Sequence, residues 1–156
     1  MITAELLIIN FEEIRRRSII LWEAVPPNVY FWRPDKDAMS FLEMVRHVLQ
    51  CEHEYHVILK ARGTPMNYVS PWDNRPFLTV QLEIEFARQF REDFLTTIRG
   101  LPDEELNTKE IIRHDVGQKS MTGRYLLKAA YHEAVHAGQF LSYLRTLRID
   151  IPKIWD

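Results

Sequence analysis

The residues with the clearest chemical potential are two histidines one helical turn apart, near the end of the chain. They frame the string His132-Glu133-Ala134-Val135-His136. At about 100° per residue the two histidines fall on the same face of a helix, with Cβ atoms about 5 to 6 Å apart. That face also carries apolar residues, so the pair is predicted to lie in the core-facing stripe. Two imidazoles placed together in such a stripe indicate a site for a divalent metal ion.

The same string matches His-Glu-x-x-His, the signature of zinc proteases. Those enzymes take a third ligand from further along the chain, either a glutamate or the last histidine of a His-x-x-Gly-x-x-His extension. Here Gly138 follows His136 by two residues rather than three, and neither a histidine nor a glutamate follows His136. A zinc protease is therefore only a remote alternative, and a third ligand is expected upstream.

Four upstream histidines are candidates for that third ligand: His47, His53, His56 and His114. On the helix predicted around residues 37–62, His47 lies at one edge of the apolar arc and His56 at the other, whereas His53 points away from it. Periodicity alone leaves the choice among them open.

Four amphipathic helices are predicted to carry these side chains, because apolar residues recur at steps of three and four. They cover about residues 2–25, 37–62, 80–100 and 120–147. The alternating apolar pattern of a β-rich protein is missing. Each helix has one apolar stripe to bury, so the sequence predicts an all-α fold, an up-down-type four-helix bundle with long loops. The length of 156 residues fits one domain over residues 1–156.

The connections between the predicted helices are long. Residues 63–77 are rich in Gly, Pro, Asn and Asp, which predicts an irregular loop of the kind that often borders a functional site. Between Leu101 and Ser120, the run Asp103-Glu104-Glu105 suggests one acidic helical turn, and the remainder is expected to be a loop.

Composition excludes several classes of protein. The chain has 20 Lys and Arg against 22 Asp and Glu, a net charge of −2, which argues against a protein that coats nucleic acid. Its first 25 residues lack the continuous apolar run of a signal peptide or a membrane span. The only cysteine, Cys51, cannot form an intramolecular disulfide. We therefore expect a cytoplasmic protein without a nucleic-acid or membrane partner.

Three groups of residues, in this order, resemble the DinB/YfiT-like metalloenzyme family, also called the DinB superfamily. They are Trp32 with Pro34, then Ser40-Phe41 followed by His47, and finally His132-x-x-x-His136-x-Gly138-Gln139. The resemblance extends over essentially the whole chain and implies a DinB/YfiT-like four-helix bundle. It also implies that His47, His132 and His136 bind one divalent metal ion, commonly nickel or zinc.

Three neutral imidazoles leave coordination positions open for water or substrate, which is typical of catalytic rather than structural sites. Such an ion lowers the pKa of a bound water to about 7 or binds a thiol as its thiolate. Nickel or zinc is expected first, and iron or manganese also fits imidazole ligands. The family resemblance includes enzymes that use low-molecular-weight thiols, so we expect a metal-dependent thiol S-transferase or small-molecule hydrolase.

The main alternative is a non-catalytic, stress-associated dimer that binds a metal or another ligand. A homodimer is expected in either case, partly on family resemblance. Three aromatic residues in the predicted loops could cover its interface: Trp32, Tyr68 and Trp72. The other expected partner is a small-molecule substrate, with a low-molecular-weight thiol as one candidate.

Several further residues are candidates for supporting roles. Glu133 and Gln139 flank the histidines and could orient an imidazole or a bound water, which makes them weak catalytic candidates. Glu52 projects near the centre of an apolar arc, where a carboxylate needs a partner, and Arg91 is the expected one. Cys51 follows His47 by one turn and is expected to be a small buried hydrophobe rather than a fourth ligand.

Overall fold

The computed structural model describes residues 1–155. Within them the chain is mostly helical, with five α-helices, one 3-10 turn and two short strands. In chain order these are α1 (Ala4–Glu23), η1 (Pro27–Val29), α2 (Phe41–Ala61), α3 (Val80–Arg99), α4 (Asp103–Thr108), β1 (Glu110–Arg113), β2 (Gln118–Met121) and α5 (Thr122–Thr146). The four long helices match the four predicted ones to within a few residues at each end.

Side-chain caps explain where three of the four long helices begin, whereas α5 follows Met121 without such a cap. Ser40 precedes α2 and forms a capping box, in which its side chain accepts from the amide of Glu43 and the Glu43 carboxylate accepts from the amide of Ser40. Thr3 and Thr79 cap α1 and α3 in the simpler way, each accepting one amide hydrogen bond. Helix α2 therefore begins at Phe41, a few residues later than its apolar pattern predicts.

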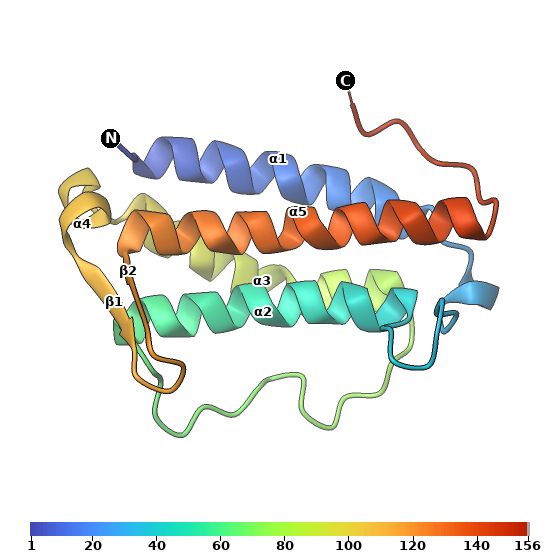
Figure 1. Cartoon of the computed structure of the whole chain (residues 1–156), viewed down its shortest axis with the longest axis horizontal. Helices are drawn as coiled ribbons and strands as arrows, with labels where there is room; N and C mark the ends of the chain where they lie inside the picture. Colours follow the sequence, from blue (N-terminus) through green and yellow to red (C-terminus); the bar gives the residue numbers. More distant parts are fainter. Residues whose placement is uncertain (156) are drawn as a thin grey trace.

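The four long helices lie side by side, with α1 against α5 and α3, and α2 against α3 and α5 (Figure 1). A strictly up-and-down order would make α2 and α3 antiparallel, yet they run in the same direction. Their partners confirm this, since Arg46 pairs with Glu83 near both starts and His56 bonds Thr97 near both ends. The cause is the connection after α2, which returns along the length of the molecule before α3 begins (Figure 1).

Arg46 fixes this long connection to the helices. Its guanidinium donates to the Glu83 carboxylate over 2.5 and 3.0 Å and to the carbonyl oxygens of Arg75 and Pro76 over 2.8 Å. Trp72 also anchors the connection, because it is only 3% exposed and packs against aromatic rings of α3. The expectation that Trp72 covers a dimer interface is therefore wrong, since its ring is already buried within the chain.

The segment before α5 also differs from expectation. Its acidic turn is confirmed as the start of α4, but part of the predicted loop is a hairpin in which β1 and β2 pair antiparallel. The hairpin lies beside the end of α2, where Gly63 pairs with Ile112. A Cβ at Gly63 would lie 2.3 Å from the Ile112 carbonyl oxygen, so only glycine permits this approach.

A buried cluster of four charged residues joins the four long helices near their middles. Arg15 of α1 donates from Nε and Nη2 to both oxygens of Glu133 of α5, over 2.8 and 2.9 Å. Its Nη2 also lies 3.2 Å from Glu52 of α2, which forms a second ion pair with Arg91 of α3. The expected pairing of Glu52 with Arg91 is thereby confirmed, as part of a larger and charge-balanced set.

The cluster divides the apolar core into two parts along the helices. One part includes Leu21, Phe41 and Phe140, and the other includes Phe11 and Phe94. Burial alone would lower the pKa of Arg15, but Glu133 and Glu52 outweigh it and raise that pKa. Burial would likewise raise the pKa of Glu133, yet Arg15 holds it below its ordinary value. Arg15 and Glu133 are therefore both charged at neutral pH.

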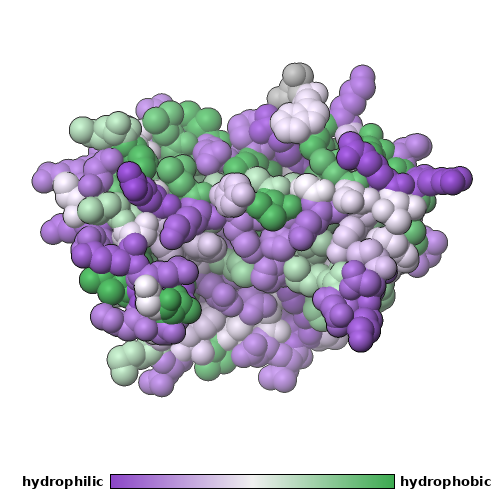
Figure 2. Space-filling view, in the orientation of Figure 1, coloured by the Kyte–Doolittle hydropathy of each residue, from purple (hydrophilic) through white to green (hydrophobic). Residues whose placement is uncertain are grey.

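Hydrophilic and hydrophobic residues are interspersed over the face formed by α5 and α2 (Figure 2). None of the helices within residues 1–155 is both long enough and apolar enough to cross a membrane.

Removing one member of the buried cluster should destabilise the fold strongly. In Glu52→Gln, Arg91 and Arg15 lose the carboxylate they share, and an uncompensated buried charge costs about 3 to 5 kcal/mol. The measurement is the free energy of unfolding from urea denaturation. The matched control is Glu85→Gln, which breaks an exposed pair with Arg88 and should cost about 0.5 kcal/mol or less. Equal losses in both variants would contradict a structural role for the cluster.

Candidate metal centre

The structure brings His47, His132 and His136 together where α2 passes α5. The two helices run antiparallel, and the pair on α5 lies opposite His47 of α2. The Nε2 atom of His132 lies 3.1 Å from Nε2 of His47 and 3.0 Å from Nε2 of His136. Of the four upstream candidates, His47 is thus the one that meets the pair on α5. All three rings are half-buried, so the cluster adjoins the surface.

Hydrogen bonding alone does not satisfy this arrangement. Each ring nitrogen offers either one N–H or one lone pair. Nε2 of His132 therefore forms one good hydrogen bond, yet it lies close to two other nitrogens. A cation resolves the conflict, because all three nitrogens can then offer lone pairs. Zinc–nitrogen bonds of about 2.0 to 2.1 Å place two ligating nitrogens about 3.0 to 3.4 Å apart, which the two distances fit. The donor set thus suits a divalent transition metal.

The protonation state of the cluster favours the same reading. Burial, together with the neighbouring rings of His136 and His47, lowers the pKa of His132 to about 4. Burial also lowers the pKa of His47 and of His136. All three imidazoles are therefore neutral at pH 7, which is the form that binds metals.

Gln139 orients one of the three rings. Its Oε1 lies 2.7 Å from Nδ1 of His136 and can only accept, so Nδ1 of His136 carries the proton. This tautomer leaves the lone pair on Nε2, which faces the cluster. The sequence-based hypothesis that Gln139 orients an imidazole agrees with this contact, which is the kind that supports metal ligands in known sites.

Glu133 lies elsewhere, although it adjoins His132 in the sequence. It is 4% exposed, and both of its carboxylate oxygens accept from Arg15 in the buried cluster. In a His-Glu-x-x-His protease this glutamate is the general base beside the metal. Here it would have to break a buried ion pair to reach the histidines. The arrangement therefore does not fit a zinc protease, nor a direct catalytic role for Glu133.

Cys51 lies at the edge of the cluster. Its Sγ is 3.6 Å from Nδ1 and 3.7 Å from Nε2 of His47. One ligand atom each from His47, Cys51 and His132 can be chosen so that all three lie within 4.8 Å of one another. Burial raises the pKa of the Cys51 thiol to about 12, and Glu54 adds to the effect, so the free thiol is protonated at neutral pH.

The other three histidines lie outside the cluster. His56 is buried and its Nε2 is 2.8 Å from the hydroxyl oxygen of Thr97. His53 contacts the rings of Trp72 and Phe90 beneath the long connection, rather than pointing into solvent as periodicity suggested. His114 is exposed in the hairpin.

A pocket of about 200 Å³ opens beside the cluster, between α2, α5 and the hairpin. Cys51 and His132 form the wall nearest the metal centre, and the remaining lining is largely polar. It includes Glu54, Arg113, Gln118, Tyr125 and Lys128. The Tyr125 hydroxyl is buried and has no well-oriented hydrogen-bond partner within residues 1–155. The contribution of Arg113 depends on the hairpin, which the sequence pattern did not predict.

Comparison with known proteins agrees with this fold. The sequence model of the DinB superfamily matches residues 10–140, and the chain therefore belongs to that family. The uncharacterised protein YjoA of Bacillus subtilis (strain 168) is 27% identical over 128 residues, which cover 81% of this chain and 79% of YjoA. The crystal structure of YjoA, described as a DinB-like protein, superposes with a TM-score of 0.72. That superposition covers 97% of this chain and 98% of YjoA, at 23% identity.

The lowered pKa of His132 gives a direct test of the site in metal-free protein. We expect its ring to remain neutral as the pH falls from 7 and to gain a proton only near pH 4, because burial and two neighbouring imidazoles oppose the charge. Ring nitrogen chemical shifts from NMR would follow this titration. A midpoint near the ordinary value of about 6.5 would show that His132 is not held in this environment.

Proposed function

We propose that the chain is a metal-dependent enzyme whose divalent ion is bound by His47, His132 and His136 within a four-helix bundle. The observation that carries this proposal is the convergence of three neutral Nε2 atoms at 3.0 and 3.1 Å. Nickel or zinc is the expected ion, and iron or manganese also suits imidazole ligands. When bound, such an ion supplies an acidified water or a coordinated thiolate at neutral pH.

The protein groups around the site suit a small polar substrate. The pocket beside His132 carries two cationic side chains, Lys128 and Arg113, the latter paired with Asp115, together with one carboxylate from Glu54. A low-molecular-weight thiol with a carboxylate and an amino group complements this set of charges. The hydroxyl of Tyr125, which interacts with Arg113, lines the same pocket and offers a further polar contact. These features favour a thiol S-transferase over a hydrolase.

The thiol in that reaction would belong to the substrate. Cys51 is the only cysteine of the chain, and burial keeps its thiol protonated at neutral pH when no metal is bound. A protonated thiol is a poor nucleophile. Within this proposal Cys51 shapes the wall between the histidines and the pocket, and the substrate enters with its own sulfur.

One observation favours the non-catalytic alternative. If Sγ of Cys51 joined the three histidines as a ligand, a tetrahedral ion would have four protein ligands, which is typical of structural sites. The chain would then be a metal-binding protein that holds its ion without turnover. In either case we propose a cytoplasmic homodimer. Trp32 is half-buried and packs against Phe41 and Tyr143, so only the exposed part of its ring is available to the dimer interface.

The metal content of the purified protein tests whether the three histidines bind an ion, which both proposals assume. Purified without an affinity tag, the wild-type protein should carry about one divalent ion per chain. The double variant His132→Ala, His136→Ala should carry almost none, because it loses two of three ligands. Inductively coupled plasma mass spectrometry measures both. His114→Ala, which removes an exposed histidine outside the cluster, is the matched control and should keep its metal. Equal metal content in all three proteins would refute the site.

An assay of thiol turnover distinguishes the proposed enzyme from the non-catalytic metal-binding protein. With a panel of cellular thiols and a small electrophile, the metal-loaded protein should consume thiol, and removal of the metal should abolish the reaction. In Lys128→Gln we expect KM for a carboxylate-bearing thiol to rise about tenfold, because one charged contact is lost. Lys36→Gln, at an exposed position away from the pocket, should leave KM unchanged. Metal-dependent binding without any turnover across the panel would favour the non-catalytic alternative.

A further inference from the structure

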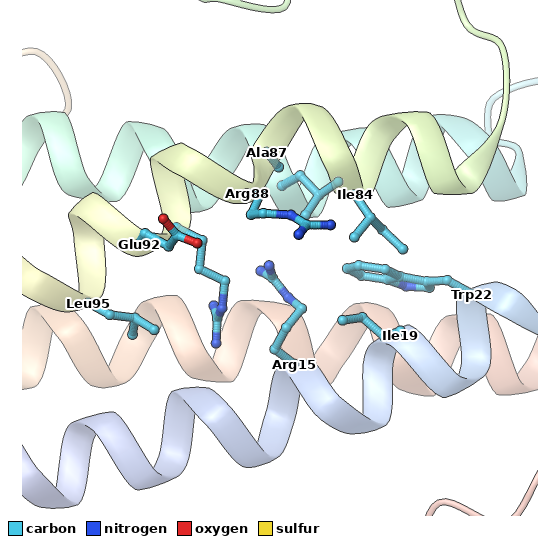
Figure 3. A pocket seen from close by; sticks show the side chains of 10 residues that line it. Arg15, Ile19, Trp22, Ile84, Ala87, Arg88, Glu92 and Leu95 are labelled. Atoms are coloured by element: carbon cyan, nitrogen blue, oxygen red, sulfur yellow. The ribbon is translucent and has the colours of Figure 1, made fainter.

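A second cavity lies on the opposite side of the helix bundle, between α1 and α3 (Figure 3). Its volume is about 380 Å³, within the range of small-molecule sites. The walls are mainly apolar, with Ile19 and Trp22 from α1 and Ile84, Ala87 and Leu95 from α3. The histidines lie where α2 meets α5, so this cavity belongs to a separate face of the molecule.

Two guanidinium groups of the buried cluster, from Arg15 and Arg91, line this cavity, and that of Arg15 has a donor without a partner. The Arg15 side chain extends from α1 into the space between α1 and α3 (Figure 3). The residue is 5% exposed, and its Nε and Nη2 atoms are engaged with Glu133 and Glu52. No partner is found for its Nη1 within residues 1–155. Two N–H donors on a buried guanidinium therefore remain available to an acceptor in the cavity.

The charges around Arg15 indicate which acceptor fits. The two arginines and two glutamates of the buried cluster already balance one another. At the rim, Arg88 is paired with Glu85, whereas Glu92 adds a negative charge without an ion pair among the described residues. Arg15, Arg88 and Arg91 line the cavity, but each is already paired with a carboxylate, from Glu133, Glu85 and Glu52 respectively. The added charge of Glu92 therefore leaves a net repulsion for an anionic ligand. A neutral oxygen accepts the same hydrogen bonds without that repulsion.

We propose that this cavity binds a neutral, largely apolar small molecule whose carbonyl oxygen accepts hydrogen bonds from Nη1 of Arg15. Trp22 forms one wall beside the guanidinium, with its ring centre 5.4 Å from the Arg15 Cζ atom, and offers a flat apolar surface to the ligand. The site is independent of the metal centre and of the function proposed for it.

Three probes with the same aromatic body test the proposal: acetophenone, toluene and benzoate. They would be titrated into the full-length 15N-labelled protein and followed by NMR. Acetophenone should bind about threefold to tenfold more tightly than toluene, because only acetophenone accepts a hydrogen bond. It should also bind more tightly than benzoate, and its largest shifts should fall on Trp22, Ile84 and Ala87.

Variants assign the binding to this cavity. Ala87→Leu fills the space and should abolish acetophenone binding, and Ile84→Phe should do the same if the first variant folds poorly. Ala61→Leu, at an exposed position at the end of α2, is the matched control and should bind normally. Glu92→Gln should tighten benzoate about two- to fivefold by removing a partly screened repulsion, and should leave acetophenone unchanged.

Three results would overturn the proposal. Equal affinities for acetophenone and toluene would show that Nη1 of Arg15 donates nothing to the ligand. Tightest binding of benzoate would make the cavity an anion site instead. Shifts confined to residues around His132 and His136 would place the probe at the metal centre, and the cavity between α1 and α3 would then have no ligand of this class.

Discussion

The structure depends on four charged side chains that meet in the middle of the core, one from each long helix. Arg15, Glu52, Arg91 and Glu133 balance in charge, and each arginine is joined to at least one carboxylate. Removing ions from water costs several kcal/mol for each, so such a cluster contributes little net stability compared with apolar packing. The cluster instead makes the packing of the helices specific, because only one register and one rotation of the four helices brings all four charges together.

That constraint determines where the three clustered histidines point. Side chains of adjacent helical residues are separated by about 100°. Since Glu133 must face Arg15 in the interior, its neighbour His132 is turned toward α2. On α2, Glu52 faces the same cluster, and Cys51 is turned toward His47 and the histidine site. The buried ion pairs therefore orient the three histidines toward one side of the molecule, and on the other side they leave Nη1 of Arg15 facing a cavity.

Periodicity predicted what depends on local sequence. The four long helices, the grouping of His132 with His136, and the pairing of Glu52 with Arg91 follow from the spacing of apolar and polar residues along single helices. The hairpin could not be predicted in this way, because each strand has four residues and its position depends on a close contact with Gly63. The parallel course of α2 and α3 was also missed, since it is decided by the path of a loop and by the anchoring of that loop.

The string His-Glu-x-x-His shows why the position of Glu133 could not be predicted from the sequence alone. In a zinc protease and in this chain, the two histidines share one helical face and the glutamate lies to one side of it. Whether that glutamate faces the metal or the protein interior depends on whether the interior contains a partner for its charge. Here Arg15, which is 118 residues away in the sequence, forms two hydrogen bonds with Glu133. The arginine thereby keeps Glu133 away from the three histidines, so the position of the general base that proteolysis needs is empty of a carboxylate from this residue.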